Sequence, residues 1–566
     1  IYADRDDYRK AALYYQQGTG IAQLMRDSWW LALMAVNLAD AALHSGDRKL
    51  AEEWNAKALA AVEQGAAPRM LPRIRLTAGR LALEQGHLES AEPLLLEAVR
   101  EAGKLGEPIA QRKAHTELAR LYARSGRLEA AGEEFRKAID VLDQERSRLG
   151  AAEFKVTMVA ERTGLYQEYV RFLVERGDDK GAAQFADSVR ARVLAEKLKH
   201  AVRPAGVLSP GNRVFLCYWL APRRSYLWAV SKSGVERFDL PGEADIAALA
   251  DPYTSDIVAG YDPIALGNPF GARLYRMLIG PAEHLVRNAA AVTVVPDGAL
   301  HRLNFETLIV ETPQPHYWIR DVTLSVAPSL AILTGDRSAR AQSGVLYIGD
   351  PKTGGAYPAL PNLGFEKDVV AKHFAAGASR LITGLHAHPD AYRDATPERF
   401  WTIHFAAHAV ANSTSPLDSA IVLSPRSGEA LESYKLYARD ILDVPIRAEL
   451  VTLSACHGAG ARSYRGEGLL GLAWAFLHAG ARNVIAGLWE ADDAAAVRLV
   501  DRLYAEVAAG AHPESALRKA KLALLDGGGR ESAPYYWASF ELFAGTLPAA
   551  APSPATLRLL RERRLP

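Results

Sequence analysis

An internal repeat in the first two hundred residues constrains the fold of this chain more than any other feature. Glycines recur at a spacing of forty residues, and each is followed by an alanine five positions later and by another twelve positions later. The repeated positions are Gly46, Gly86 and Gly126, then Ala51, Ala91 and Ala131, then Ala58, Ala98 and Ala138. Three matched positions in three copies indicate one supersecondary unit that recurs along the chain.

Each copy has the pattern of a helical hairpin. The first helix ends at a short turn, where glycine permits the left-handed conformation, and the second carries alanines where it approaches its partner. A weaker copy follows at Gly177 and Ala182. The pattern resembles tetratricopeptide and related helical-hairpin repeats over roughly residues 28–200, although forty residues exceeds their usual length of about 34. We therefore expect an all-α repeat domain over residues 1–202, with a concave groove that binds a protein or peptide.

Proline and glycine end the helical region at residues 203–211, and the prevailing residue types then change. Short stretches rich in aromatic and β-branched residues predict strands, and helical patterns follow near 243–259 and 269–288. The predicted strands of this region are Val214–Tyr218, Ser225–Val230, Gly234–Leu240, Ala291–Pro296 and Thr323–Ala327.

From about residue 344 strands alternate with helices, which requires a mostly parallel sheet covered on both faces. The strands predicted there are Val345–Ile348, Arg380–Thr383, Trp401–Phe405, Leu450–Leu453 and Asn483–Leu488. Active sites of such sheets form at the carboxyl ends of the strands. The motifs that carry chemistry should therefore lie just after these segments.

Two reactive side chains meet this expectation. His408 follows the strand predicted at 401–405, and Cys456 follows the strand predicted at 450–453. If these strands are neighbours, both side chains reach the same edge of the sheet. An imidazole beside a thiol can accept its proton and leave a nucleophilic thiolate.

Several motifs resemble those of the CHAT family, bacterial relatives of caspases and separases. The resemblance covers roughly residues 205–546 and includes the segments around His408 and Cys456. Its supporting segments are 295–301, 327–330, 466–468, 479–481, 487–489 and 535–540. The resemblance implies a caspase-like α/β fold with an inactive first half at 203–340, a catalytic half at 341–548 and a C-terminal tail at 549–566.

What the resemblance implies for function is cysteine endopeptidase activity without a cofactor. His408 would be the base and Cys456 the nucleophile, and the backbone N–H groups of Cys456 and Ala409 would hold the oxyanion. The family usually has glycine where this chain has Ala409, and alanine supplies the same N–H wherever the backbone does not require glycine. In relatives this architecture occurs in bacterial defence, including antiviral defence, and in programmed death.

An acidic segment follows the strand predicted at 483–488. In separase-like relatives an aspartate near this point recognises a basic side chain before the scissile bond, and the resemblance assigns this role to Asp493, with Asp492 as the alternative. A carboxylate facing a guanidinium favours Arg over Lys. Alternatively, both carboxylates cap the helix that begins near residue 494, because a helix N-terminus favours negative charge.

Other interpretations of these side chains remain open. His404, His408, Cys456 and His457 could bind zinc, but a single thiol after a strand lacks the closely paired spacing of structural zinc sites. His404 is otherwise a strand residue that packs or hydrogen-bonds near the site, and Cys217 is a core residue. The chain could also be an interaction scaffold with a protease fold of weak or lost activity.

The composition gives few further constraints. Lys and Arg total 67 against 66 Asp and Glu, so the net charge of +1 predicts neither a nucleic acid nor a membrane partner. Two cysteines in unrelated surroundings argue against a disulfide framework and favour a reducing, cytoplasmic location. No signal peptide or membrane-spanning run is apparent. We expect a protein substrate, and an activating protein bound by the repeats.

Overall fold

The structure is a computed structural model that describes most of the chain. The chain forms two compact units. The described residues are 2, 7–63, 68–147, 163–190, 212–331, 333, 344–354, 357, 360, 362–375, 377–412, 415–426, 434–454, 462–464 and 468–545. The first unit comprises residues 1–158 and 164–177, and the second comprises 159–163 and 178–566. The predicted C-terminal tail lies outside the described residues.

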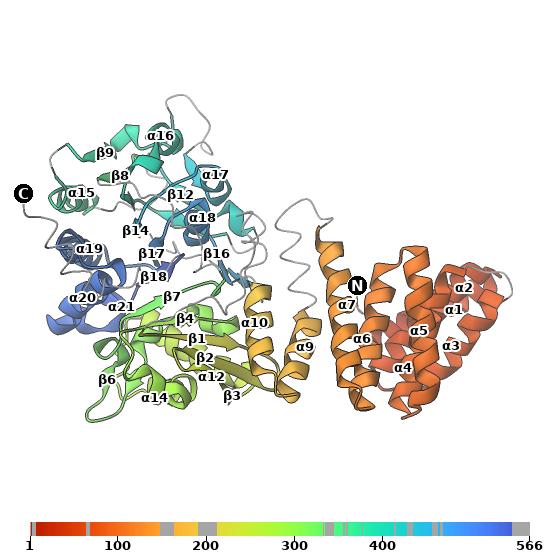
Figure 1. The fold of residues 1–566 in the computed structure, drawn as a ribbon. Coiled ribbons are helices and arrows are strands. Elements are labelled where there is room, and N and C mark those ends of the chain that lie inside the picture. The colour runs from red at the N-terminus through yellow and green to blue at the C-terminus, as the bar shows by residue number, and fades with distance from the viewer. Residues whose placement is uncertain are drawn as a thin grey trace, which may run out of the picture. The chain divides into compact units, whose positions relative to one another are not determined.

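The first unit is built from antiparallel helices, which confirms the predicted helical repeats (Figure 1). Its helices are α1 (Tyr8–Leu24), α2 (Ser28–His44), α3 (Arg48–Glu63), α4 (Leu71–Glu84), α5 (Leu88–Leu105), α6 (Pro108–Arg124), α7 (Leu128–Ser147) and α9 (Thr163–Glu175). The turns that join α2 to α3, α4 to α5 and α6 to α7 contain Gly46, Gly86 and Gly126. All three glycines have positive φ, from 74° to 87°, which side chains other than glycine seldom adopt.

The repeated alanines lie where the helices pack together. Ala51, Ala91 and Ala131 have no exposed surface, and Ala58, Ala98 and Ala138 expose at most 1% of theirs. A methyl side chain lets two helices approach closely, so a larger residue at these positions would separate the hairpins. The forty-residue spacing therefore reflects one packing contact that is repeated in each hairpin.

The second unit is organised around one sheet of eleven strands, in the order β3-β2-β1-β4-β7-β18-β17-β14-β10-β8-β9 (Figure 1). Its first five strands in this order come from the first half of the region: β1 (Arg213–Trp219), β2 (Ser225–Ser231), β3 (Gly234–Leu240), β4 (Ala291–Val295) and β7 (Leu324–Val326). The other half contributes β8 (Val345–Gly349), β9 (Ser379–Thr383), β10 (Thr402–Ala406), β14 (Leu450–Ser454), β17 (Asn483–Gly487) and β18 (Phe540–Ala544). The two halves join where Val326 of β7 pairs with Phe543 of β18.

The mixed α/β architecture and its predicted strands are confirmed. The strands β8, β9, β10, β14 and β17 run parallel, whereas β18 is antiparallel to β17 and parallel to β7. Helices α15 (Leu363–Ala371), α19 (Asp493–Ala508) and α20 (Pro513–Asp526) follow or lie between these strands. The helix predicted at 269–288 is interrupted at Gly280–Ala282, because Pro281 cannot donate a backbone hydrogen bond.

Helix α10 (Asp179–Arg190) groups with the second unit, although its sequence pattern predicts a place in the repeat domain. The carboxylate of Asp187 accepts hydrogen bonds from the backbone N–H groups of Leu330 and Ala331, at 2.6 and 2.9 Å. Asp179 pairs with Arg237 of β3 at 2.6 Å. These long-range contacts decide where α10 belongs, and local helical periodicity carries no information about them. The predicted boundary at residue 202 lies outside the described residues.

A small antiparallel sheet was not predicted. It consists of β11 (Ala409–Val410), β12 (Ala420–Val422) and β13 (Lys435–Tyr437), in that order. Strands this short have no readable alternation of polar and apolar residues. In the part of the chain that the structure describes, we find no helix that is both long and apolar enough to span a membrane.

Candidate functional site

His408 lies at the carboxyl end of β10, between this strand and β11. The strand residues 402–406 are all buried, whereas His408 is half-buried. Its ring stacks on that of Tyr357, with centroids 5.6 Å apart and an interplanar angle of 29°. Its backbone carbonyl accepts a hydrogen bond from the N–H of Val422 at 2.8 Å. The imidazole is therefore held at the sheet edge by contacts on its ring and on its backbone.

Strands β10 and β14 are parallel neighbours, as predicted. In their register Ala406 lies opposite Ser454. His408 is two residues beyond Ala406, and position 456 is two residues beyond Ser454. Cys456 and His457 lie outside the described residues, so the proximity of thiol and imidazole stays a prediction.

The backbone of Ala409, the predicted oxyanion donor, belongs to the ladder of β11 and β12. Ala409 lies opposite Ile421 in the antiparallel pair of β11 and β12, and the N–H of Val422 donates to the carbonyl of His408. Hydrogen-bonded and non-hydrogen-bonded pairs alternate in such ladders, so the N–H of Ala409 faces away from β12. Among the described residues, the non-glycine residues with positive φ are Arg26, Asp350 and Thr396. Ala409 therefore adopts its conformation without needing glycine.

The two aspartates of the predicted substrate pocket have different roles in the structure. Asp492 is the N-cap of α19, where its carboxylate accepts a hydrogen bond from the N–H of Ala495 at 2.9 Å. The Oδ2 atom of Asp493 accepts bonds from the backbone N–H and the side-chain amide of Asn362, at 3.0 and 2.8 Å. The capping interpretation thus holds for Asp492. Asp493 instead ties the start of α19 to the start of α15, at the carboxyl edge of the sheet.

A pocket of about 520 Å³ lies along β11, beginning two residues after His408. Its lining residues are Val410, Ala411, Asn412, Asp418, Ala420, Lys435, Tyr437 and Arg439. Arg439 pairs with Asp418 and stacks on the ring of Tyr437 at 4.1 Å. Sequence reasoning missed this pocket because three separate short strands assemble it.

His404 belongs to a buried polar network beneath the site. Its Nδ1 lies 2.9 Å from the hydroxyl of Tyr504, and its Nε2 lies 2.9 Å from the carboxylate of Glu366. The Tyr504 hydroxyl also donates to Thr452 of β14 at 2.9 Å, and the Tyr347 ring stacks on the imidazole. His404 is thus a strand residue that hydrogen-bonds near the site, as predicted.

The hydrogen bonds of this network argue against His404 as a zinc ligand. Both ring nitrogens of His404 already have hydrogen-bonding partners, which leaves neither for a metal. No cluster of three or more His, Cys, Asp or Glu side chains suited to a metal occurs within the described ranges. Two of the four side chains considered, Cys456 and His457, lie outside those ranges.

Cys217 lies in β1 and is 5% exposed. Burial, with a further effect of the Asp187 charge, raises the pKa of its thiol far above the usual range. A thiol with a raised pKa supplies little thiolate and reacts slowly. The interpretation of Cys217 as a core residue is therefore confirmed.

Known proteins resemble both parts of the chain. Residues 268–546 match the model of the CHAT domain. Tetratricopeptide repeat protein 28 of Mus musculus is 30% identical over 145 residues, which cover 26% of this chain and 6% of the mouse protein. A chain of the Saccharomyces cerevisiae separase–securin complex superposes with a TM-score of 0.50 at 9% identity, covering 96% of this chain and 49% of that one. At this identity the likeness establishes the fold alone.

The alignment with the Arg-specific cysteine proteinase gingipain R covers 53% of this chain and 74% of the gingipain chain at 11% identity. Its TM-score of 0.32 is too low to carry an inference. The chain spans only a small part of the mouse protein and about half of the yeast chain that it matches. The activities of those whole proteins are therefore not transferred to it.

Proposed function

Starting from a chain that carries a CHAT domain at residues 268–546 behind tetratricopeptide-like helical repeats, we propose that it is a cysteine endopeptidase in which Cys456 is the nucleophile and His408 the base. The observation that carries the proposal is the register of β10 and β14, in which Ala406 lies opposite Ser454. Because the reactive positions follow these residues at equal distance in the sequence, we expect both at one edge of the sheet.

In the proposed reaction His408 accepts the proton of the Cys456 thiol, and the thiolate attacks the carbonyl carbon of the scissile peptide. The N–H groups of Ala409 and Cys456 stabilise the oxyanion of the tetrahedral intermediate. His408 then donates its proton to the leaving amine, which departs and leaves an acyl-enzyme. A water molecule, deprotonated by His408, hydrolyses the thioester and restores the thiol. No cofactor takes part.

We further propose cleavage after a basic residue, preferably Arg, recognised by Asp493. The hydrogen bonds from Asn362 support this role because they fix the carboxylate at the sheet edge where His408 lies. The pocket along β11 gives an adjoining surface for further substrate residues. The helical repeats would recruit substrate or an activating protein, and the role in defence is implied by the family resemblance alone.

The test is covalent labelling of the full chain with an acyloxymethyl ketone that carries an arginine. We expect labelling of Cys456 in the wild type, none in Cys456→Ala, and strongly reduced labelling in His408→Ala. The matched control is Cys217→Ala, which removes the other cysteine and should label like the wild type. Equal labelling of wild type and Cys456→Ala, or none in either, would contradict the proposal.

The same measurement distinguishes the proposed endopeptidase from a second candidate function, an inactive scaffold. The sequence feature that favoured a scaffold is Ala409, which stands where the family usually has glycine. Since the backbone at Ala409 lies outside the left-handed region, this feature no longer argues against activity. A scaffold would leave Cys456 unlabelled by the ketone in the folded wild type.

A further inference from the structure

Helix α1 continues the forty-residue pattern of the hairpins. Ala11 and Gly18 of α1 precede Ala51 and Ala58 of α3 by forty residues, so small residues again occupy the positions where a second helix meets its neighbours. A Cβ atom added to Gly18 would lie 2.9 Å from the Sδ atom of Met34 in α2, closer than packed atoms come. Helix α1 therefore has the sequence pattern and the packing of the second helix of a hairpin.

Residues 1–7 do not supply the first helix of that hairpin. The first helices of the other hairpins, α2, α4 and α6, contain 17, 14 and 17 residues. Seven residues are too few to form a helix of this length. Within the repeat unit, α1 and α2 lie at one end of the row of helices (Figure 1).

Apolar side chains of α1 are exposed at positions that are covered in the next hairpin. Tyr14 and Ile21 expose 53% and 59% of their surface, although the ring of Tyr2 stacks on that of Tyr14 at a centroid distance of 5.1 Å. The equivalent residues of α3, Trp54 and Ala61, expose 7% and 5%, because they share a core cluster with α2, the first helix of their hairpin. A first helix beside α1 would cover Tyr14 and Ile21 in the same way.

Two further apolar residues extend this surface. Trp30 at the start of α2 is 48% exposed, whereas its equivalent Met70 packs against the core cluster of α2 and α3. Leu24, the last residue of α1, is 87% exposed. At 3.6 residues per turn, the side chains at 14, 21 and 24 lie within about 80° on one side of the helix. We define the end face as Tyr14, Ile21, Leu24 and Trp30.

The apolar character of the end face is unusual for the end of a repeat array. An end that faces solvent carries a polar outer surface, because the array would otherwise leave one half of a helix–helix interface uncovered. Single exposed apolar residues are common on proteins, but here they occupy positions that are buried in the next hairpin. The end face therefore continues the repeated interface beyond α1.

We propose that the end face binds an amphipathic helix of a partner protein, which packs against α1 as a first helix would. The contact requires a small residue on that helix. Ala39, Gly79 and Ala119 stand forty residues apart in the first helices, and all three are buried. A Cβ atom added to Gly79 would lie 2.6 Å from the side chain of Leu95 in α5, so little space exists at this position.

The charges beside the end face favour a partner helix with acidic residues over a second copy of this chain. The charged residues of α1 are Arg9 and Lys10, and Arg26 follows the helix. Asp7 pairs with Lys10 at 3.0 Å, but Arg9 and Arg26 form no ion pair with the residues that the structure describes. Two α1 helices packed antiparallel about a two-fold axis would bring Arg9 of one copy toward Arg26 of the other.

This inference concerns the partner that the proposed function leaves open, and it rests on that function only for the partner's role. Its test measures binding rather than cleavage, so it can fail while Cys456 is active or hold while Cys456 is inert. The probe is a fluorescent peptide with the sequence of residues 27–46, because α2 packs on α3 as the partner helix should pack on α1. This peptide contains two aspartates and neither lysine nor arginine. The comparison peptide carries Ala39→Leu.

The structure offers closely matched variants for fluorescence anisotropy with the full chain. The double variant Tyr14→Gln, Ile21→Gln removes two apolar side chains of the end face. The control Leu96→Gln, Ile109→Gln removes apolar side chains of similar exposure, 46% and 49%, from α5 and α6. We expect the first variant to bind the peptide about tenfold more weakly and the control to bind like the wild type. The Ala39→Leu peptide should bind the wild type more weakly than the unsubstituted peptide.

Failure of the wild type to bind the peptide, equal binding by the two double variants, or equal binding of the two peptides would each overturn the proposal. Sedimentation velocity tests a second copy as the occupant, and a wild-type dimer that Tyr14→Gln, Ile21→Gln abolishes would also overturn it. So would pelleting with vesicles of phosphatidylcholine and phosphatidylserine that the same variant abolishes. Thermal unfolding checks that each variant remains folded. Should the first variant unfold, the preference of the wild type for the unsubstituted peptide decides.

Discussion

Ala406 at the end of β10 lies directly opposite Ser454 at the end of β14, in a parallel ladder. This pairing aligns the carboxyl ends of two strands that are forty-eight residues apart in sequence. His408 follows one strand, and Cys456 follows the other at the same offset. The predictions below concern this edge and the buried groups that support it.

Substitutions of Ala409 test the proposed oxyanion donor. Ala409→Gly keeps the N–H, so we expect kcat to change by no more than about threefold. Ala409→Pro removes the N–H without removing a hydrogen bond to β12, and should lower kcat by about 10² to 10³. Peptide hydrolysis by folded variants, checked by circular dichroism, measures both effects. Wild-type kcat in Ala409→Pro would rule out this donor.

The two aspartates should separate substrate recognition from helix capping. Asp493→Asn should lower kcat/KM for arginine substrates at least about tenfold, because the carboxylate that pairs with the guanidinium is lost. Asp492→Ala should instead lower the free energy of unfolding by about 1 kcal/mol through loss of the N-cap, with arginine preference retained. The measurements are hydrolysis of paired Arg and neutral peptides and urea unfolding. A reversed pattern would assign the pocket to Asp492.

Cys217 should be unreactive in the native protein. Its burial raises the thiol pKa, so iodoacetamide at pH 8 should modify it only after unfolding. Mass spectrometry of tryptic peptides before and after urea treatment measures the difference. Rapid native modification of Cys217 would show that β1 is accessible to solvent.

The buried network around His404 should contribute measurably to stability. Tyr504→Phe leaves Thr452 and His404 without the hydroxyl that they share, and should lower the free energy of unfolding by about 1 to 3 kcal/mol. The comparison variant Tyr347→Phe removes a single longer bond, 3.2 Å to the Leu363 carbonyl, and should cost less. Urea unfolding followed by tyrosine and tryptophan fluorescence compares them. Equal losses would mean that the network acts no differently from an isolated hydrogen bond.

Glu541 of β18 should make stability depend on pH. Its burial, opposed by Lys521 and aided by Glu306, raises the pKa of this carboxyl from 4.5 to about 8. Between these values the native state keeps a proton that the unfolded state releases. This contribution to stability is complete below about pH 4.5 and is lost as the pH rises through about 8.

The measurement is urea unfolding at several pH values between about 5 and 8, on the wild type and on Glu541→Gln. We expect the free energy of unfolding to fall with rising pH in the wild type and to fall less steeply in Glu541→Gln. Because glutamine cannot ionise, the free energy of unfolding of the variant should rise relative to that of the wild type as the pH approaches 8. Parallel curves would show that Glu541 does not carry this dependence.

Local patterns were sufficient for the repeats and for most strands of the sheet. The recurrence of Gly46, Gly86 and Gly126 reports a backbone conformation that each turn requires, so it is visible without any partner. The strand predicted at 401–405 could be read from its β-branched and aromatic residues, which are frequent in strands. The candidate base followed from its place after that strand.

Tertiary contacts determined what local patterns could not. Asp492 and Asp493 are adjacent acids at one helix start, and only the position of Asn362, at the start of another helix, distinguishes the cap from the residue held at the sheet edge. Helix α10 looks like its neighbours in the repeats, yet hydrogen bonds from residues 330 and 331 group it with the second unit.

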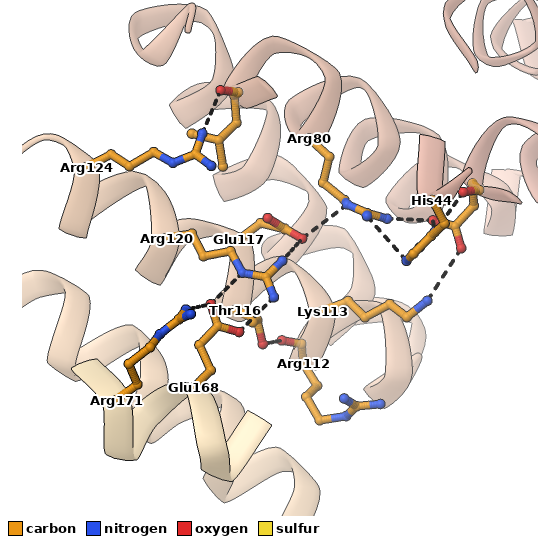
Figure 2. Close-up of polar contacts among 12 residues, drawn as sticks. His44, Arg80, Arg112, Lys113, Thr116, Glu117, Arg120, Arg124, Glu168 and Arg171 are labelled. Carbon is orange, nitrogen blue, oxygen red and sulfur yellow. Dashed lines mark hydrogen bonds and ion pairs between the residues drawn. The ribbon is translucent and has the colours of Figure 1, made fainter. Parts of the chain in front are cut away.

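By itself, the order of residues determined the elements, because turn conformation and the burial of one face depend on neighbours in the chain. Which elements meet, and therefore which of several similar side chains faces a ligand, was decided only in the folded protein. The ion pairs of the repeat unit illustrate this: Asp40, Arg80 and Glu117 are ordinary charges in the sequence. Packing of α2, α4 and α6 brings Arg80 within 2.7 Å of Asp40 and 3.1 Å of Glu117 and leaves its side chain only 12% exposed (Figure 2).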